Sequence, residues 1–291
     1  MRKTVVILAS ALLLLANGPV LAGEPASATP PSPYTLTVIP FYSPEKLWTL
    51  YSPLIGYLIK TTGQAWELKL YHDHEAVIDA LCKGEVSVAL LGPVPMGRVY
   101  QKCGARPVLV ALGKDGKPFY RSVIVTNDRS VTSLKMLEGK KFGLLKGSTA
   151  AHIVPLKMMK DAGVGPGSIK QIFFEGQDRI MTALLSQEVQ AAGVKDALYR
   201  KFEHEEIKLL KSSDLLPNFA FCAAPTVKPA VLRRFKQQLL RLKPLSGSAD
   251  ARTVRDWDDE IRNGFTRAGA EYLRAVIRLH GIYEEIAHED R

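Results

Sequence analysis

Short apolar runs alternate with amphipathic segments from Tyr34 to the end of the chain. The apolar runs are rich in β-branched and aromatic residues and are bounded by turn residues, which predicts strands. The amphipathic segments repeat apolar residues at helical spacing, which predicts helices with one face toward a core. The predicted strands are residues 34–41, 66–70, 86–91, 108–112, 122–127, 141–145, 169–174, 189–194 and 207–210. The predicted helices are residues 44–59, 75–83, 94–102, 133–137, 150–162, 179–186, 229–242 and 271–285, with one more around Val254.

The alternation of strands and helices is typical of an α/β protein with crossover helices. Two such units can be distinguished, and two extended crossings join them at residues 118–125 and 217–223. We therefore predict two lobes on a hinge, with a ligand cleft between two doubly wound lobes. Lobe 1 comprises residues 34–118 and 223–291, and lobe 2 comprises residues 119–222.

The N-terminus has the pattern of a secretory signal peptide. Two basic residues precede an apolar run at 5–16, and small residues follow up to Ala22, which predicts a signal peptide of residues 1–22 that is cleaved after Ala22. An uncleaved anchor is the competing interpretation, but Gly18-Pro19 interrupts the run before the roughly 20 residues that a spanning helix needs. Residues 23–33 are Pro-rich and predict a flexible lead-in. We expect an exported, soluble, periplasmic protein.

The charge balance favours anionic ligands. The chain has 39 Lys and Arg against 29 Asp and Glu, a formal net charge of +10, and removal of the two basic leader residues leaves 10 − 2 = +8. The basic residues are scattered and are not interleaved with aromatic residues, which argues against nucleic acid as a partner.

The cysteines and histidines form no metal motif. Cys82, Cys103 and Cys222 contain no CxxC spacing. In an oxidising compartment Cys82 and Cys103 can form a disulfide, since each lies near the end of a predicted helix on either side of one strand; two buried free thiols are the alternative. His72 and His74 flank an aspartate, but nothing completes a ligand set. We predict no metal and no cofactor.

Polar and glycine residues follow three of the predicted strands. In open α/β sheets ligands bind at the carboxyl ends of the strands, so these positions are candidates for a ligand site. They are Tyr42-Ser43 after the first strand, Gly92-Pro93 after the third, and Gly147-Ser148-Thr149 after a strand of lobe 2.

The segment Gly147-Ser148-Thr149 precedes an apolar helical run and has two interpretations. A hydroxyl can cap the helix by accepting a hydrogen bond from an early amide. The free amides at the helix start can instead bind a small anion, which the helix dipole favours. The spacing of a P-loop is absent, so nucleotide hydrolysis is not supported.

Three further positions each have a ligand interpretation and a structural one. Tyr120 begins a hinge strand, where its phenol can donate into the cleft or pack at a sheet edge. Asp196 follows a strand and is a ligand-binding carboxylate or a helix cap. Gln177, with Asp178, follows a glycine turn and binds ligand or caps a helix.

Catalytic patterns are weak. Ser148 and His152 share one face of a predicted helix, but the sequence places no acid to complete a triad, and no GxSxG motif is present. We therefore predict a binding protein rather than an enzyme.

Several stretches together resemble the periplasmic substrate-binding proteins of phosphate, phosphite and phosphonate ABC transporters, which share the type II two-lobed binding fold. They are PLIGYLIKTTG (53–63), ALCKGEVSVALLGP (80–93), YRSVIV (120–125), LEGKKFGLLKGSTAAHIVP (137–155) and VKD (194–196). The resemblance covers most of the chain after residue 33 and implies that fold.

The resemblance also implies a ligand-binding set: Tyr42, Ser43, Tyr120, Ser148, Thr149, the Ala150 amide and Asp196. The chain departs from the family pattern at several positions. The turn that usually reads Gly-Ser-His-Asp is Gly176-Gln177-Asp178 here. The usual motif G-D-P-x-S-T-S-G is replaced by Leu144-Leu145-Lys146-Gly147 before Ser148-Thr149 and by Ala150-Ala151 after it. Ser87 lies where an aspartate is usual, and Met96 lies where an aromatic residue is common.

The function that these observations predict is capture of a small oxyanion for an ABC-transporter permease by a monomeric binding protein. A stand-alone sensor of the same fold, which signals to a membrane kinase or cyclase, is the alternative. A periplasmic hydrolase acting through Ser148 is a third class.

Overall fold

The structure is a computed structural model, and it describes residues 32–289. The predicted signal peptide and residues 23–31 of the predicted lead-in lie outside the described residues. Within the described residues, no helix is both long enough and apolar enough to cross a membrane.

A six-stranded mixed sheet forms the first lobe, with the strand order β13-β4-β12-β3-β1-β2. Its strands are β1 (Tyr34–Val38), β2 (Trp66–Leu68), β3 (Val88–Leu91), β4 (Arg106–Ala111), β12 (Ala220–Ala223) and β13 (Phe265–Arg267). β1 is parallel to β2 and β3, whereas β12 is antiparallel to β3 and β4. The chain therefore returns to this sheet after building the second one.

A five-stranded sheet forms the second lobe, with the order β10-β6-β9-β7-β8. Its strands are β6 (Ser122–Thr126), β7 (Lys141–Leu144), β8 (Lys170–Phe173), β9 (Ala191–Lys195) and β10 (Lys208–Ser212). β7 is parallel to β8 and β9, and β6 is antiparallel to β9 and β10.

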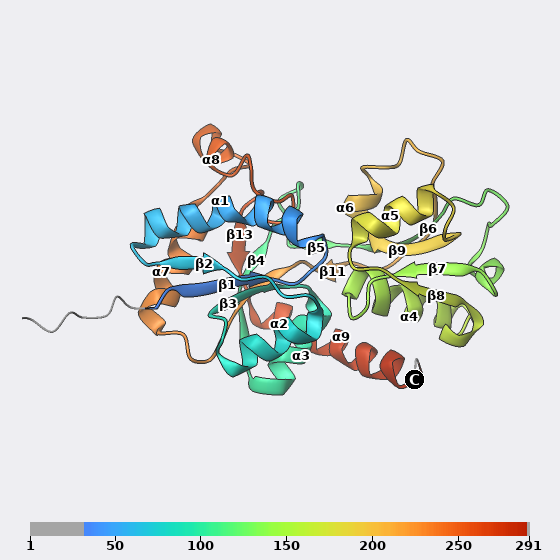
Figure 1. Ribbon diagram of the computed structural model, residues 1–291, viewed down its shortest axis with the longest axis horizontal. Coiled ribbons are helices and arrows are strands. Elements are labelled where there is room, and N and C mark those ends of the chain that lie inside the picture. Colours follow the sequence, from blue (N-terminus) through green and yellow to red (C-terminus); the bar gives the residue numbers. More distant parts are fainter. Residues whose placement is uncertain (1–31, 290–291) are drawn as a thin grey trace, which may run out of the picture. The chain divides into compact units, whose positions relative to one another are not determined.

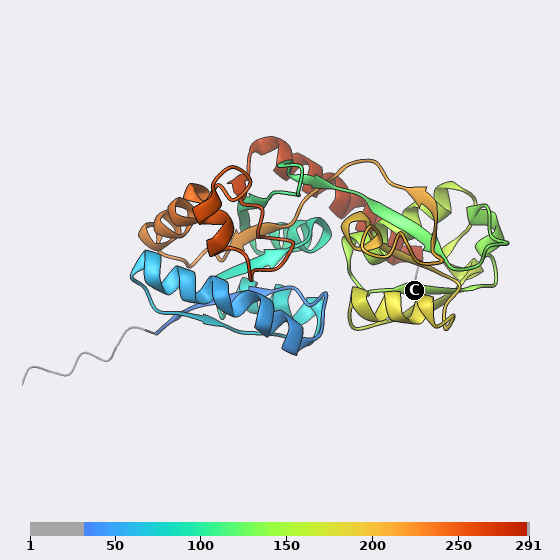
Figure 2. The same ribbon diagram turned by 90° about the horizontal axis from the view of Figure 1, so that it is seen from above.

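Two crossings connect the lobes and pair with each other. They contain β5 (Phe119–Tyr120) and β11 (Leu216–Pro217), which form a short antiparallel ladder. Figure 2 shows the two crossings, in green and orange, running between the sheets. The predicted two-lobed α/β fold with two hinge strands is confirmed.

The helices cover both faces of the first sheet, with α1 on one side and α2 and α3 on the other (Figure 1). The helices of this lobe are α1 (Pro44–Thr62), α2 (His74–Lys83), α3 (Pro93–Cys103), α7 (Pro229–Arg241), α8 (Ser248–Thr253) and α9 (Ala270–Glu289). The second lobe has η1 (Leu134–Leu137), η2 (Thr149–Ile153), α4 (Val154–Asp161), η3 (Pro166–Ser168), α5 (Gln177–Leu185) and α6 (Asp196–Tyr199).

Several predicted bounds were wrong for identifiable reasons. α1 continues three residues past 59 and ends where Gly63 adopts the left-handed conformation and its amide bonds to the Ile59 carbonyl. The Thr61 and Thr62 hydroxyls donate to carbonyls four residues back, so both residues fit within the helix. The helix predicted at 150–162 begins one residue earlier, as the π-helical turn η2 followed by α4. The sequence prediction missed β13, a strand of three residues.

The long C-terminal helix α9 contacts both lobes. A Cβ added at Gly97 of α3 would lie 2.8 Å from the His280 Cβ, so only glycine allows this close approach. Toward the helix end, Lys160 of α4 forms ion pairs with Glu285, at 2.7 Å, and with Glu289. The helix α9 therefore links α3 of the first lobe to α4 of the second.

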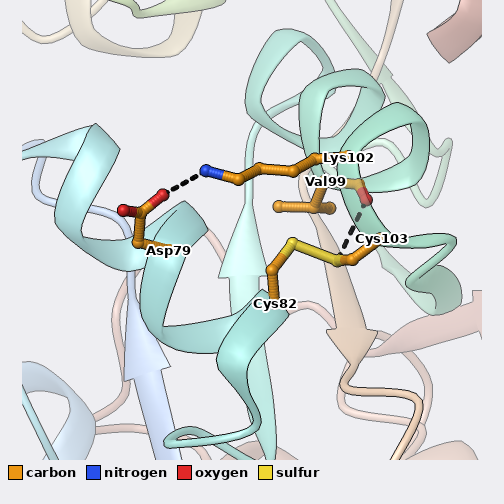
Figure 3. Close-up of a disulfide and its surroundings, with 5 residues drawn as sticks. All are labelled: Asp79, Cys82, Val99, Lys102 and Cys103. Carbon is orange, nitrogen blue, oxygen red and sulfur yellow. Dashed lines mark hydrogen bonds and ion pairs between the residues drawn. A yellow bond between two sulfur atoms is a disulfide. The ribbon is translucent and has the colours of Figure 1, made fainter.

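A disulfide joins Cys82 at the end of α2 to Cys103 at the end of α3, with the Cα atoms 5.5 Å apart. Figure 3 shows the Lys102–Asp79 ion pair linking the same two helices. The remaining cysteine, Cys222, is buried in β12, and burial raises the pKa of its thiol.

Candidate functional site

A cavity of about 660 Å³ is lined by residues of both lobes and of the two crossings. Four of the residues singled out in the sequence line it: Tyr42, Tyr120, Gln177 and Asp196. The others do not belong to its lining: Ser43, Gly92, Pro93, Gly147, Ser148, Thr149 and Ala150. The structure thus divides the predicted site between a cavity and a neighbouring turn.

The loop after β1 brings Tyr42 to the cavity and turns Ser43 away from it. Ser43 is exposed and caps α1, because its hydroxyl accepts a hydrogen bond from the Lys46 amide. The Lys46 ammonium lies 3.5 Å from the centre of the Tyr42 ring and 3.5 Å from the Asp178 carboxylate of lobe 2. This loop therefore meets the second lobe at the cavity.

Gln177 holds that contact in place. Its backbone amide donates to the Phe41 carbonyl at 3.0 Å, and its side-chain oxygen accepts from the Lys195 backbone amide at 3.1 Å. A Cβ at Gly176 would lie 3.2 Å from the Phe41 carbonyl oxygen, which explains the glycine before Gln177. The Gln177 side chain thus positions the end of β9 against the loop after β1.

The Gly147 turn is built from capping interactions. Gly147 has φ +76°, a left-handed conformation that favours glycine, and its amide donates to Nδ1 of His152 at 3.1 Å. The Ser148 hydroxyl accepts from the Ala151 amide at 3.2 Å. Ser148 is therefore the N-cap of the helix that begins with η2.

Thr149 connects this turn to lobe 1. Its hydroxyl oxygen accepts a 2.8 Å hydrogen bond from the buried Val94 amide, and it lies 3.5 Å from where a Cβ at Gly92 would be. Within residues 32–289 the amides of Thr149 and Ala150 have no hydrogen-bond partner, as expected for the first amides of a helix. Two helix amides therefore remain available beside Gly92.

Tyr120 lies between the cavity and the turn. It is 4% exposed, and its hydroxyl makes no well-formed hydrogen bond in the described part of the chain. Burial raises the pKa of the phenol well above its usual range; Glu260 adds to the rise, and the nearby Thr149 hydroxyl opposes it. A buried phenol without a partner is a donor available to a ligand.

His74 packs behind the turn. It is buried and begins α2, one residue before the predicted start of that helix at residue 75. Its Nε2 lies 3.1 Å from the Pro40 carbonyl, and its Nδ1 lies 3.2 Å from where a Cβ at Gly147 would be. Burial lowers its pKa to about 4, so the ring is neutral at pH 7. Among the described residues no group of three His, Cys, Asp or Glu can hold a metal.

The sequence analysis missed Lys195, at the end of β9. Its ammonium donates to both carboxylate oxygens of Glu260, each at 2.6 Å, and to the Asn218 side-chain oxygen at 2.9 Å. The Lys195 and Glu260 side chains are each 10% exposed. The ammonium also lies 4.4 Å from the centre of the Tyr120 ring. The only sequence signal was its position before Asp196 at a strand end.

Asp196 and four further acidic residues line the cavity: Asp115, Asp258, Asp259 and Glu260. Asp196 accepts from the Ala197 amide at 2.8 Å and pairs with Arg200, so it acts within its own helical turn. Asp258 is 4% exposed and accepts from the Tyr51 hydroxyl at 3.3 Å. Burial, reinforced by the neighbouring Glu260 carboxylate, raises the Asp258 pKa to about 6.

The comparisons with known proteins decide the family. Residues 36–272 match the model of the periplasmic substrate-binding proteins of phosphonate ABC transporters. The chain belongs to this family. Members of the family are substrate-binding components of transporters rather than enzymes, and they are periplasmic.

Relatives agree with this assignment. The phosphate-import protein PhnD of Mycolicibacterium smegmatis is 26% identical over 251 residues, covering 78% of each chain. The structure of PhnD1 from Prochlorococcus marinus in complex with methylphosphonate has a TM-score of 0.74 at 14% identity, covering 87% of this chain and 98% of that one. A binding protein of an ABC phosphonate transporter from Pseudomonas aeruginosa has a TM-score of 0.71 at 16% identity, with coverage of 88% and 96%. At these identities the structural matches show the shared fold.

Proposed function

We propose that this protein captures a small phosphorus oxyanion, namely phosphate, phosphite or a phosphonate, and delivers it to an ABC-transporter permease. The observation that carries the proposal is the junction of the Thr149 and Ala150 amides with the buried Tyr120 hydroxyl. These are three donors without partners in the described residues, and they lie where lobe 2 meets Gly92 of lobe 1. Donors at a helix start favour negative charge.

The Thr149 hydroxyl adds a further donor. Its oxygen accepts from the Val94 amide, so its hydrogen remains to be donated, either to the nearby Tyr120 hydroxyl or to the ligand. Because Val94 belongs to α3 of lobe 1, an anion bound here interacts with a contact between the lobes. Binding therefore favours the closed arrangement.

The relatives point to the same chemical class. One is named for phosphate import and another was solved with methylphosphonate, which supports a tetrahedral phosphorus oxyanion here. Export through the signal peptide of residues 1–22 and action as a monomer complete the proposal, and sedimentation with and without ligand tests the latter.

Calorimetry tests the proposal. The purified protein is titrated with phosphate, phosphite, methylphosphonate and an aminophosphonate, and we expect at least one of them to bind tightly. Thr149→Ala should weaken that ligand by about tenfold or more, since a hydrogen bond to a charged group contributes about 1.5–3 kcal/mol.

Thr253→Ala is the control, because the Thr253 hydroxyl also makes a hydrogen bond, which it donates to the Ala249 carbonyl, but Thr253 is exposed on α8. It should leave the affinity unchanged. If no oxyanion binds, and Thr149→Ala changes only the stability, the turn is a helix cap and the proposal fails.

A further inference from the structure

The Lys195–Glu260 pair lines the same cavity as Tyr42 and Tyr120. Lys195 is held by the strand β9 and by the bond of its amide to Gln177. Glu260, in contrast, lies in a segment of turns between α8 and β13. The ammonium is therefore fixed in position, and its counter-ion sits on an irregular segment.

The Glu260 carboxylate contacts the Lys195 ammonium as a small bound anion would. Both oxygens of Glu260 lie 2.6 Å from the Lys195 ammonium nitrogen, and the Asn218 side-chain oxygen accepts a further hydrogen bond from it at 2.9 Å. The rings of Tyr120 and Phe219 flank the ammonium at 4.4 Å and 5.0 Å. Two oxygens of a tetrahedral oxyanion offer an ammonium the same charge and the same pair of acceptors as a carboxylate.

We propose that Lys195 is a ligand-binding cation of this cavity, and that Glu260 is its internal counter-anion, which an anionic group of the ligand displaces. This inference rests on the proposed function and names a specificity-determining pair for it. Tyr120 links the two parts of the site, because its ring lies beside Lys195 and its hydroxyl lies near Thr149. A ligand whose oxyanion reaches Tyr120 is therefore within reach of Lys195.

The exchange has a consequence for affinity. Glu260 competes with the ligand, so the observed affinity is lower than that of the same cavity with an unpaired Lys195. Loss of the carboxylate leaves a buried ammonium without a counter-charge, which strengthens the attraction for any anion that can enter. Neutral ligands gain nothing from this change.

The test is calorimetry of three variants with phosphate and methylphosphonate. Glu260→Gln keeps the shape and one acceptor, and it should bind the preferred oxyanion about tenfold more tightly than the wild type. Lys195→Met should bind it about tenfold or more weakly. The double variant should behave like Lys195→Met, because Glu260 acts through Lys195.

Asp259→Asn is the matched control. Asp259 lines the same cavity but pairs with Lys201 and Arg262, so it measures how much the loss of any nearby negative charge helps an anion. Circular dichroism checks the folding of each variant. Lys195→Gln, which keeps a donor for Glu260, replaces Lys195→Met if the latter does not fold.

The outcomes separate this inference from the proposed function. Suppose that the wild type binds an oxyanion, and that the affinity of Glu260→Gln rises no more than that of Asp259→Asn, or decreases. The Lys195–Glu260 pair then has only a structural role, and this inference alone is wrong. If Glu260→Gln binds an oxyanion and the wild type does not, the displacement model is supported. If neither protein binds any oxyanion, both proposals fail.

Discussion

The Gly147 turn and the Lys195–Glu260 pair are two buried polar contacts between the lobes, and both lie next to Tyr120. The turn is held together by hydroxyls, a histidine ring nitrogen and backbone amides. It retains two helix amides without partners in the described residues, so the anion of the proposed function would displace no protein group there. The pair is made of full charges that already satisfy each other, so an anion can join it only by exchange.

The two contacts therefore differ in how much each contributes to the stability of the fold and in how open each is to an incoming anion. A buried ion pair is costly to break from one side, because the remaining charge stays desolvated. A capped helix start loses little when one hydroxyl is removed. The Lys195–Glu260 pair should therefore contribute more to the free energy of unfolding than the Gly147 turn does. The turn should be the part of the site that an anion contacts first.

The largest expected effect is on the stability of Lys195→Met. Removing one partner of a buried pair costs about 3–5 kcal/mol, and both side chains here are only 10% exposed. Urea denaturation of the wild type and the variant at pH 7 measures this free energy of unfolding. A loss below 1 kcal/mol would show that water reaches Glu260 and that the pair is not truly buried.

A pH series separates the two regions, because a buried group beside each has a shifted pKa: the Asp258 pKa is raised and the His74 pKa is lowered. The Asp258 pKa is raised from 3.8 to about 6, so the native state holds the proton longer than the unfolded state. Ionisation of Asp258 therefore lowers the free energy of unfolding as the pH rises from 4 to 6, by about 3 kcal/mol over the whole range. The His74 pKa is lowered from 6.5 to about 4, so stability falls as pH drops through the same window, by a similar amount.

Two variants resolve the opposing slopes. Asp258→Asn keeps an acceptor for the Tyr51 hydroxyl and removes the carboxylate. Its unfolding free energy should therefore rise more steeply with pH between 4 and 6 than that of the wild type, and should exceed it at pH 7. His74→Gln should show the reverse slope. If Asp258→Asn leaves the slope between pH 4 and 6 unchanged, the carboxyl group titrates normally and the cavity wall is wetter than its burial indicates.

Much of the fold followed from local patterns. Continuous apolar runs such as 88–91 and the glycine stops at Gly63 and Gly84 predicted the order of strands and helices. The misses were short elements without periodicity. β13 has three residues, and it is a strand because β4 offers it an antiparallel edge, which is information that its own sequence lacks.

The candidate site was harder to predict because its partners are far apart in the chain. Ser148 was predicted to be a cap or an anion ligand, and the cap is now visible. The bond from Val94 to Thr149 spans 55 residues, and the Lys195–Glu260 pair spans 65. No spacing rule links such positions. A lysine at a strand end looks like any solvated lysine until the second crossing and the turns after α8 bring Asn218 and Glu260 to it.

The smallest expected effect distinguishes capping from binding at the turn. Ser148→Ala removes the acceptor of the Ala151 amide, which should lower the free energy of unfolding by about 1 kcal/mol. The amides of Thr149 and Ala150 and the hydroxyl of Thr149 remain, so oxyanion affinity should change by less than about threefold, far less than a full charge-assisted hydrogen bond contributes. Urea denaturation and calorimetry on the same preparation give both values. A variant of unchanged stability that no longer binds oxyanions would reverse the assignment, because the Ser148 hydroxyl would then bind the ligand and would not stabilise the helix as a cap.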